Sequence, residues 1–158
     1  MRLTTKGRYA VTAMLDLAFH YEKGPVTLTE ISGRQSISLS YLEQLFARLR
    51  KAGLVVGVRG PGGGYRLKKT LEAISIADIV IAVDEVIDST NCEGKGDCQD
   101  DLPCLTHHLW VGLSRHIKDY LQGISLSDLM LRKEFQEVAG RQDKKAEQDI
   151  KLDLYMRI

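Results

Sequence analysis

The hydrophobic pattern of residues 5–67 changes its period once, and this change limits the possible folds more than any other feature. Up to Gly53 the apolar residues recur at the spacing of amphipathic helices. Residues 54–59 and 65–67 are strand-like, and the glycine-rich stretch 60–64 forms a turn between them. Three helices followed by a hairpin is the element order of a winged helix-turn-helix domain. We therefore expect a mainly α fold with a small β-hairpin wing.

Capping signals mark the starts of the second and third helices. Thr27 and Glu30 match the capping-box pattern in front of a short second helix. Ser40 and Glu43 repeat this pattern in front of a third helix over about 41–52. The third helix has a single apolar stripe, formed by Leu42, Leu45, Phe46 and Leu49. This stripe is expected to pack inward and to leave the polar face of the helix exposed.

Helical patterns return in the second half of the chain. Ser75 and Asp78 cap a fourth helix that reaches about residue 86, and 125–133 forms a short last helix. A long helix over 106–122 has an apolar stripe of Leu109, Trp110, Leu113, Ile117, Tyr120 and Leu121. We divide the chain into a winged helix-turn-helix domain at 1–86, a cysteine-rich loop at 87–105, a dimerisation helix with the last helix at 106–139, and a polar, mobile tail at 140–158.

The predicted helix over 106–122 is longer than is needed to complete the winged helix-turn-helix domain at 1–86. A single winged helix-turn-helix domain recognises only a few base pairs of DNA. We therefore expect two copies of the chain to associate through this helix as a homodimer, which places two such domains on a palindromic DNA site. The alternative is that its stripe packs on the first and fourth helices of the same chain.

The formal net charge of +1 hides a strong asymmetry. Residues 1–69 contain 12 Lys and Arg against 4 Asp and Glu, whereas residues 70–158 contain 10 against 17. A basic front half is typical of a surface that binds a polyanion such as DNA. The alternative of two ordinary solvated surfaces with opposite sign stays open on charge alone.

The start of the third helix provides candidate DNA-binding residues. In helix-turn-helix proteins, the first residues of the second helix of the motif meet base edges in the major groove. Tyr41 and Gln44 can donate and accept hydrogen bonds there. Lys6, Arg8, Ser38 and Ser40 lie at helix starts, where they are placed to hold backbone phosphates. Each of these residues has an alternative role in capping or as ordinary surface.

Glu43 and Arg59 are candidates for specificity. Phosphates repel a carboxylate, so Glu43 either accepts a hydrogen bond from a cytosine amino group or rejects sites that lack one. Its alternative role is the capping box. Arg59 stands beside the glycine-rich turn, and a thin loop with one arginine suits a minor groove. A phosphate-binding loop is disfavoured here, because no Lys-Ser/Thr follows and the turn leads into a strand.

All three cysteines fall in the stretch CEGKGDCQDDLPCLTHH at 92–108. Cys92, Cys98, Cys104 and His107 follow the spacing Cys-x5-Cys-x5-Cys-x2-His. Zinc sites use tight pairs such as Cys-x2-Cys, whereas longer gaps favour a larger object such as an iron–sulfur cluster. Cys104 and His107 face the same side of a first helical turn, so His107 rather than His108 is the expected fourth ligand. An imidazole ligand gives weaker, pH-sensitive ligation, which suits a sensor.

Several alternatives use the same residues. A zinc ion with these four ligands is one, and an iron–sulfur carrier that does not bind DNA is another. A thiol redox switch needs an electropositive setting, which the acidic loop lacks. A catalytic Cys–His pair lacks oxyanion donors, so we expect no enzyme. An odd cysteine count without a signal-peptide or bilayer-spanning pattern predicts a cytoplasmic protein with reduced thiols and no membrane association.

Four stretches resemble a known family, namely MRLTTKGRYAVTAMLDLA, ISLSYLEQLFARLRKAGLV, VRGPGGGY and CEGKGDCQDDLPCLTH. Through them, about residues 1–140 resemble the small bacterial winged-helix repressors that include the iron–sulfur cluster regulators. The cluster in that family is a [2Fe–2S] centre held by three cysteines and one histidine. These ligands fall without gaps on Cys92, Cys98, Cys104 and His107.

The resemblance implies a homodimeric transcription regulator, chiefly a repressor, that controls the genes for iron–sulfur cluster assembly and receives its cluster from the assembly machinery. It also implies that the cluster-free form binds a second class of DNA sites. Under this interpretation, Glu43 discriminates between the two classes. Ser40, Tyr41, Gln44 and Arg59 would then read features that are common to both.

Overall fold

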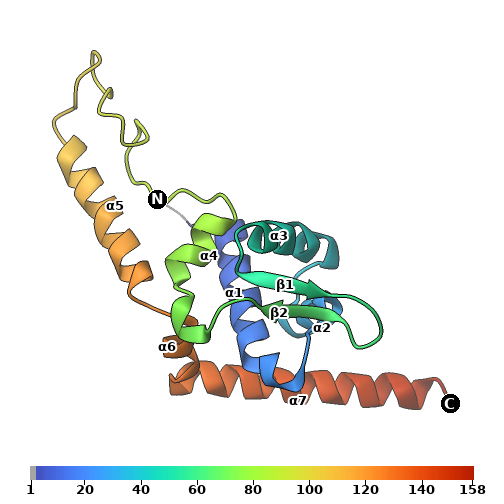
Figure 1. Cartoon of the computed structure of the whole chain (residues 1–158). Coiled ribbons are helices and arrows are strands. Elements are labelled where there is room, and N and C mark those ends of the chain that lie inside the picture. Colours follow the sequence, from blue (N-terminus) through green and yellow to red (C-terminus); the bar gives the residue numbers. More distant parts are fainter. Residues whose placement is uncertain (1–2) are drawn as a thin grey trace.

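The computed structural model describes residues 3–158 and is mainly helical, with one two-stranded antiparallel sheet (Figure 1). In chain order the elements are α1 (Thr5–His20), the 3-10 helix η1 (Tyr21–Lys23), α2 (Leu28–Gln35), α3 (Leu39–Lys51), β1 (Val55–Val58), β2 (Gly64–Leu67), the 3-10 helix η2 (Leu71–Ala73), α4 (Ile76–Ala82), α5 (His107–Gln122), α6 (Leu126–Met130) and α7 (Lys133–Met156). The order of α1, α2, α3 and the β1–β2 hairpin confirms the expected winged helix-turn-helix.

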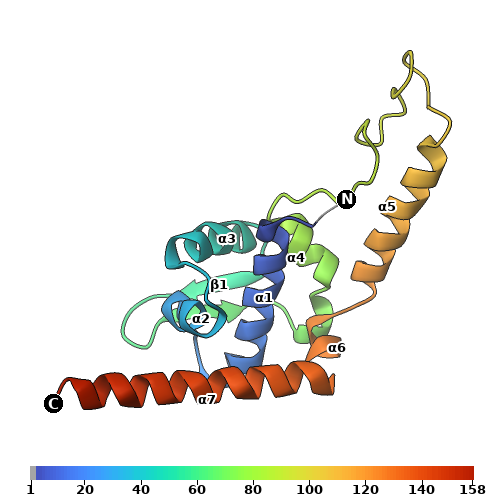
Figure 2. The ribbon, with the colours of Figure 1, turned by 180° about the vertical axis from the view of Figure 1, so that it is seen from behind.

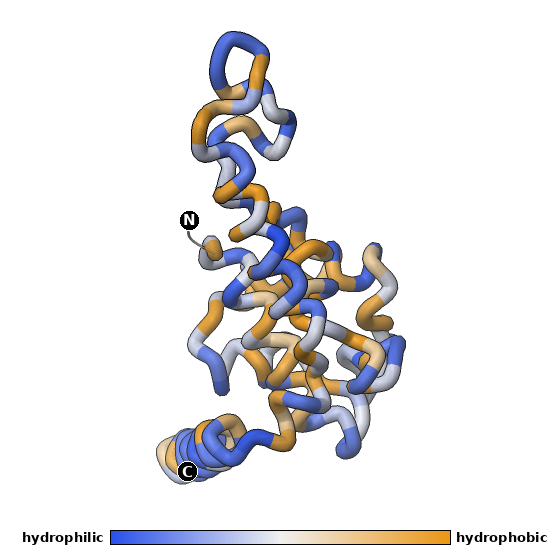
Figure 3. The backbone as a smooth tube through the Cα atoms, turned by 90° about the vertical axis from the view of Figure 1, so that its left-hand side faces the viewer, coloured by the Kyte–Doolittle hydropathy of each residue, from blue (hydrophilic) through white to orange (hydrophobic). Residues whose placement is uncertain are grey.

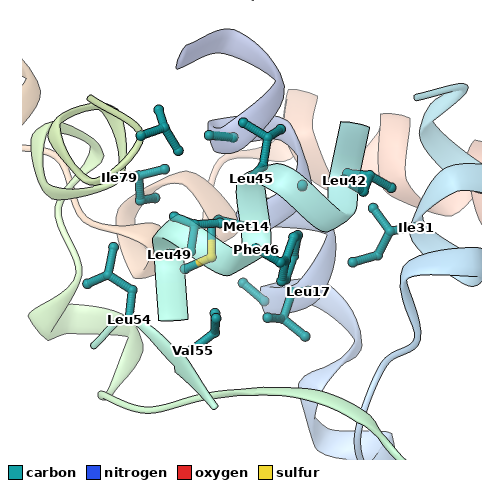
Figure 4. Packing of buried hydrophobic residues seen from close by; sticks show 14 of the residues in the cluster. Met14, Leu17, Ile31, Leu42, Leu45, Phe46, Leu49, Leu54, Val55 and Ile79 are labelled. Carbon is teal, nitrogen blue, oxygen red and sulfur yellow. The ribbon is translucent and has the colours of Figure 1, made fainter. Parts of the chain in front are cut away.

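The core of this domain lies between α1, α3 and α4 (Figure 4). Met14 and Leu17 of α1 pack with Phe46 and Leu49 of α3 and with Ile79 of α4, and all five are fully buried. Burial of one such side chain stabilises the fold by about 1.5–3 kcal/mol. The predicted apolar stripe of α3 is buried along its whole length, so the core fixes which face of α3 points outward.

The wing is joined at its base to the loop before α2. Val26 and Tyr65 exchange two backbone hydrogen bonds, at 3.0 and 2.7 Å, and the Tyr65 ring packs against Phe46 with centroids 4.8 Å apart. A Cβ on Gly64 would lie 2.5 Å from the Val26 carbonyl oxygen, so only glycine allows this approach. The strand register pairs Val55 with Leu67, Val56 with Arg66, Gly57 with Tyr65 and Val58 with Gly64.

The start of α3 differs from the expectation. Ser38 is the N-cap of α3, and its hydroxyl accepts a hydrogen bond from the Tyr41 N–H at 3.3 Å. The expected capping box of Ser40 and Glu43 is therefore wrong, because both residues lie inside the helix with exposed side chains. Ser36 takes a left-handed conformation, with φ of 55°, and this turn ends α2 early enough for Ser38 to cap α3. The capping box expected before α2 is confirmed.

The elements after the wing begin with two similar capping boxes. The expected box of Ser75 and Asp78 opens α4, and a second box opens α6. Helix α4 ends at Ala82 rather than near residue 86, because the chain turns through a left-handed Asp84 with φ of 58°. Two backbone hydrogen bonds join α6 to the start of α4, from the Ile76 N–H to the Ile124 oxygen at 2.9 Å and from the Leu126 N–H to the Ile74 oxygen at 3.0 Å.

Helix α5 leans away from the domain, and the cysteine-rich loop lies at its far end (Figures 1 and 2). The helix runs beside α4, yet most of its apolar stripe stays exposed. The exposed fraction is 62% for Leu109 and 65% for Tyr120. Packing on helices of the same chain, the alternative considered above, therefore leaves most of this stripe uncovered.

Residues 140–156 belong to a helix, in the part of the chain where the sequence suggested a polar, mobile tail. One helix, α7, runs from Lys133 to Met156 and crosses the domain past α1 and α2 (Figures 1 and 2). Its Lys, Glu, Gln and Ala residues are strong helix formers. Phe135 packs against the core, and Gln142 exchanges two hydrogen bonds with Gln35 of α2 at 2.8 and 3.0 Å. Figure 3 views α7 end-on and shows its mixed hydropathy. Within residues 3–158, no helix has the length and apolar character needed to cross a bilayer.

Candidate metal centre and nucleic-acid interface

The cysteine-rich loop between α4 and α5 consists of tight turns. Glu93, Asp100 and Asp101 take positive φ angles of 47–59°, as do Gly94 and Gly96 at 75° and 77°. Glycine favours this region of backbone conformation, whereas other residues adopt it at a cost. The turns fold the loop back on itself, so that all three cysteines come near the first turn of α5.

Two thiols and one imidazole converge in this loop. The Sγ atoms of Cys92 and Cys98 lie 3.4 and 3.6 Å from Nδ1 of His107, and the three ligand atoms lie within 4.8 Å of one another. Cys104 is the fourth expected ligand, and its N–H donates to Cys98 Sγ at 3.0 Å. All four residues line one small cavity of about 150 Å³, so the structure brings three expected ligands together with the fourth beside them.

His107 and His108 have different environments. His107 is the first residue of α5 and is buried, with 7% of its surface exposed, whereas His108 is exposed. The His107 imidazole points toward the thiols, and its other side lies near Gly96. The geometry therefore favours His107 as the ligand, as expected from the sequence.

The environment changes the pKa of each thiol. Hydrogen bonding, chiefly from the Gly96 N–H, lowers the pKa of Cys92 below its usual value. A hydrogen bond with the side chain of Cys98 lowers the pKa of Cys104. A hydrogen bond from the Cys104 N–H acts to lower the pKa of Cys98. Partial desolvation of the Cys98 thiol and the nearby thiols of Cys104 and Cys92 act in the opposite direction, and together they raise this pKa. A thiol must lose its proton to bind a metal, so the lowered pKa values of Cys92 and Cys104 favour ligation.

The donor set fits both of the metal groups considered above. Three thiolates and one imidazole provide four ligands, which is the number that a [2Fe–2S] cluster takes. The compact spacing also suits one tetrahedral zinc ion, whose ligand atoms lie roughly 3.5 Å apart when the bonds are about 2.0–2.3 Å long. The site can thus hold a single metal ion or a small cluster.

The candidate DNA-binding residues of α3 line a surface hollow of about 520 Å³. Ser38, Ser40, Tyr41 and Gln44 are the expected residues in this lining. The rest of the lining consists of Thr5 and Tyr9 of α1 and of Ser36 and Ile37 in the turn before α3, and none of these was predicted from the sequence to bind DNA. The Tyr9 and Tyr41 rings meet edge to face, with centroids 5.8 Å apart. Tyr9 follows the same helical period as the buried apolar residues of α1. In the sequence, its position at the edge of that apolar stripe was the only sign that it could face the hollow.

Three other candidates do not line this hollow. Glu43 is exposed on α3, and its side chain makes no hydrogen bond or ion pair among residues 3–158. Arg59 is exposed at the end of β1, beside Gly60 with φ of 91°. Lys6 of α1 donates from Nζ to the Asp84 carbonyl oxygen at 3.3 Å, which holds it partly on its own chain.

Comparison with known proteins gives consistent results. The model of the Rrf2 family, described as an iron-dependent transcriptional regulator, matches residues 3–132. The HTH-type transcriptional regulator IscR of Vibrio cholerae is 62% identical over 143 residues, which are 90% of this chain and 83% of that protein. IscR of Photobacterium profundum is 60% identical over the same shares.

Solved structures agree with these relatives. The structure of T. potens IscR is similar with a TM-score of 0.68 and 39% identity, over 82% of this chain and 86% of that one. CymR, the global cysteine regulator of B. subtilis, has a TM-score of 0.71 and 34% identity, over 82% and 95% of the two chains. These proteins are transcription regulators and not enzymes, which argues against the iron–sulfur carrier. The chain is a DNA-binding transcriptional regulator and belongs to the Rrf2 family.

Proposed function

We propose that this regulator senses iron–sulfur status through a [2Fe–2S] cluster held by Cys92, Cys98, Cys104 and His107. The observation that carries the proposal is the convergence of two thiols on the His107 imidazole, with the third thiol lining the same cavity. The family description as iron-dependent and the IscR name of the relatives support it. Three loop residues and the first residue of α5 would hold the cluster, which would supply iron–sulfur redox chemistry.

The residues of the chain have distinct roles in this proposal. The three cysteines lie in the loop, whereas His107 is the first residue of α5, so ligation fixes the loop against that helix. The lowered pKa values of Cys92 and Cys104 help these thiols to ionise. His107 ligates only through an unprotonated nitrogen, which makes it the ligand most easily lost.

We further propose that two copies meet through the exposed stripe of α5 and bind palindromic promoter sites. A twofold dimer buries the same apolar surface on both copies, and Leu109 and Tyr120 are available for it. Tyr41, Gln44 and Ser40 would then read the major groove, Arg59 the minor groove, and Lys6 and Ser38 the phosphates.

The proposed targets are the genes for iron–sulfur cluster assembly, with the assembly machinery as the source of the cluster. The cluster-free form would bind a second class of sites, so that cluster status selects among promoters. Because its DNA targets are chromosomal, we propose that the protein acts in the bacterial cytoplasm.

Anaerobic purification tests the cluster. We expect a reddish-brown protein with visible absorption and with equal amounts of iron and acid-labile sulfide. Replacement of any one cysteine by serine, or His107→Gln, should lower the iron content at least severalfold. His108→Gln is the matched control and should keep the cluster, because His108 is exposed and outside the cavity.

A zinc-responsive regulator is the second candidate, because the same four ligands at this spacing also suit one tetrahedral zinc ion. Under this alternative, the protein is colourless and contains one zinc per chain without sulfide. That result would overturn the cluster and leave the same four residues as ligands. A metal-free protein whose thiols form disulfides reversibly would point instead to a thiol-based regulator.

A further inference from the structure

The segment 83–85 links α4 to the cysteine-rich loop and contacts both helices that carry candidate DNA-binding residues. Glu85 lies three residues after the end of α4 and seven residues before Cys92. Its neighbours contact α1 on one side and α3 on the other. The segment is therefore the covalent start of the loop and also part of the packing of the DNA-binding domain.

Glu85 is a buried charged residue, with 8% of its surface exposed. Its carboxylate accepts hydrogen bonds from the N–H of Thr4 and, at 2.9 Å, from the Thr4 hydroxyl. Thr4 is the N-cap residue of α1, so the carboxylate lies at the positive end of the helix dipole. No Lys or Arg within residues 3–158 forms an ion pair with it, and the carboxylate thus depends on the start of α1.

Gly7 also lies close to the Glu85 carboxylate. Gly7 is in the first turn of α1 and is buried. A Cβ at this position would lie 2.9 Å from Cδ of Glu85 and still closer to Oε2. A larger residue at this position would therefore require the Glu85 carboxylate to shift away from the first turn of α1.

The same segment holds α3 through Arg48. The Arg48 Nη1 atom donates to the Val83 carbonyl oxygen at 3.1 Å and to Oδ2 of Asp84 at 2.8 Å. The Asp84 carbonyl oxygen accepts from Lys6 Nζ of α1 at 3.3 Å. Asp84 stands in the left-handed region with φ of 58°, and this turn directs its side chain and its carbonyl to different helices.

The next few residues are attached to α5. The Ser89 N–H donates to Ser114 Oγ of α5 at 2.8 Å, and Ser114 Oγ lies 3.3 Å from Oδ1 of Asp88. The same Asp88 oxygen accepts from the N–H and the hydroxyl of Thr90 at 2.8 Å. Only two residues separate Glu85 from Asp88, so a short stretch of backbone connects the DNA-binding helices to α5 and to Cys92.

We propose that Asp84 and Glu85 are positioning residues, which couple metal binding in the loop to the placement of α1 and α3 on DNA. The proposal rests on the proposed function, because it needs a cluster-bound and a cluster-free state. Ligation of Cys92 and His107 fixes the loop against α5 and changes the path of the residues before Cys92. The contacts of Glu85 with Thr4, and of Asp84 with Arg48, transmit that change to the first turn of α1 and to α3.

The size of the effect follows from the contacts. A ligand shifts an equilibrium only by its difference in affinity for the two states. One hydrogen bond to a buried charged group, made in one state and weakened in the other, changes the DNA affinity about tenfold. The Asp84–Arg48 pair is exposed and contributes a smaller change, about two- to fivefold.

The test measures DNA affinity of the holo and the apo protein for two variants. Its probe is a labelled duplex with the palindrome that wild-type holo-protein selects from a random pool, titrated at one fixed salt concentration. Glu85→Gln keeps the size of the side chain but replaces one acceptor by a donor. Asp84→Asn tolerates the left-handed backbone and removes the charge that faces Arg48. Glu72→Gln, exposed on η2, is the matched control.

We expect unchanged iron and sulfide content in both variants, because neither residue is a proposed ligand. The ratio of holo to apo DNA affinity should move toward one in both variants. We expect this ratio to change about tenfold for Glu85→Gln and about two- to fivefold for Asp84→Asn, while the control keeps the wild-type ratio. A ratio unchanged in both variants would overturn the proposal, and so would an equal loss of affinity in the two forms. If Glu85→Gln does not fold, the ratio measured for Asp84→Asn decides.

The two proposals fail in different ways. If wild-type protein binds no cluster, or binds DNA equally in both forms, the proposed function fails and the coupling fails with it. If the wild type shows a difference that both variants keep, only the coupling through Asp84 and Glu85 is wrong.

Discussion

Asp16 of α1 and Arg34 of α2 form a two-point ion pair, with Arg34 Nε and Nη2 donating to the carboxylate at 3.0 and 2.8 Å. Asp16 is 3% exposed and also accepts from Gln35 at 2.7 Å, and His20 lies within 3.5 Å of it. These bonds hold the pKa of Asp16 below its usual value, although burial, the largest single effect, acts to raise it. The pair therefore fixes the angle between the first two helices of the DNA-binding domain.

Asp16→Ala should destabilise the fold by about 3–5 kcal/mol, because it leaves a largely buried Arg34 and His20 without their main partner. Urea denaturation should show the loss as a lower midpoint at an unchanged slope. Asp153→Ala is the matched control, since it removes an exposed ion pair with Arg157 in α7 and should cost at most about 0.5 kcal/mol. Equal effects of the two substitutions would contradict the role assigned to Asp16.

His20 should make stability depend on pH. Its hydrogen bond to Asp16 is the main cause that raises the pKa of His20 to about 9, and Asp143 of α7, whose Oδ1 lies 2.7 Å from Nε2, adds to it. Because the folded pKa is above the unfolded value of 6.5, the stabilisation is complete below pH 6.5 and is lost as pH rises toward 9. We expect a decrease on the order of 1–2 kcal/mol over this range, after allowance for screening at the Asp143 side.

Thermal or urea unfolding at pH 6, 7.5 and 9 measures this decrease. His20→Gln should flatten the profile over that range, whereas the exposed His116→Gln should leave it unchanged. A profile that is just as steep in His20→Gln would show that other groups cause the pH dependence.

Glu43→Ala should relax the discrimination between the two classes of DNA site. Glu43 is not a capping residue, and its exposed carboxylate has no partner within the described part of the chain. Removing one favourable or unfavourable contact to a base typically changes the difference in binding free energy between two DNA sites by about 1–3 kcal/mol. Binding titrations at fixed salt with one duplex of each class should show a gain mainly at the disfavoured class. Equal changes at both classes would count against this role.

Gly140→Ala should stabilise α7 by about 0.5–1 kcal/mol, because Gly140 lies in the middle of the helix and an added Cβ meets no atom within 4 Å. Gly64→Ala provides the contrast, since the same methyl group there meets the Val26 backbone and the φ of 148° disfavours alanine. Circular dichroism melts should move in opposite directions for the two substitutions. No change for Gly140→Ala would indicate that α7 is not helical at this position in solution.

Local signals in the sequence predicted most of the DNA-binding domain. The apolar stripe of α3, the glycine-rich turn of the wing and the capping boxes at Thr27 and Ser75 depend on residues close together in the chain. Spacing likewise pointed to the four candidate ligands. The predicted start of α3 was wrong because Ser38 and Ser40 are both possible N-cap residues. The left-handed turn at Ser36 decides between them in favour of Ser38.

Other features depend on segments that are far apart in the chain. The polarity of residues after 140 suggested a mobile tail, whereas docking on α1 and α2 through His20–Asp143 and Gln35–Gln142 holds a helix there. No periodicity predicts that Glu85 meets Thr4, or that Asp84 meets Arg48. These contacts arise because the core brings α1, α3 and α4 together.

The sequence by itself determined the winged helix-turn-helix, the basic front half and the set of thiol and imidazole donors, because helix period, turn chemistry and ligand type are local properties. Only the tertiary structure decided which donors converge, which polar residues share the hollow beside α3, and where α7 lies. Those relationships depend on how buried faces pack and on how left-handed turns at Ser36 and Asp84 redirect the chain. The same packing places the start of the cysteine-rich loop against the helices proposed to read DNA.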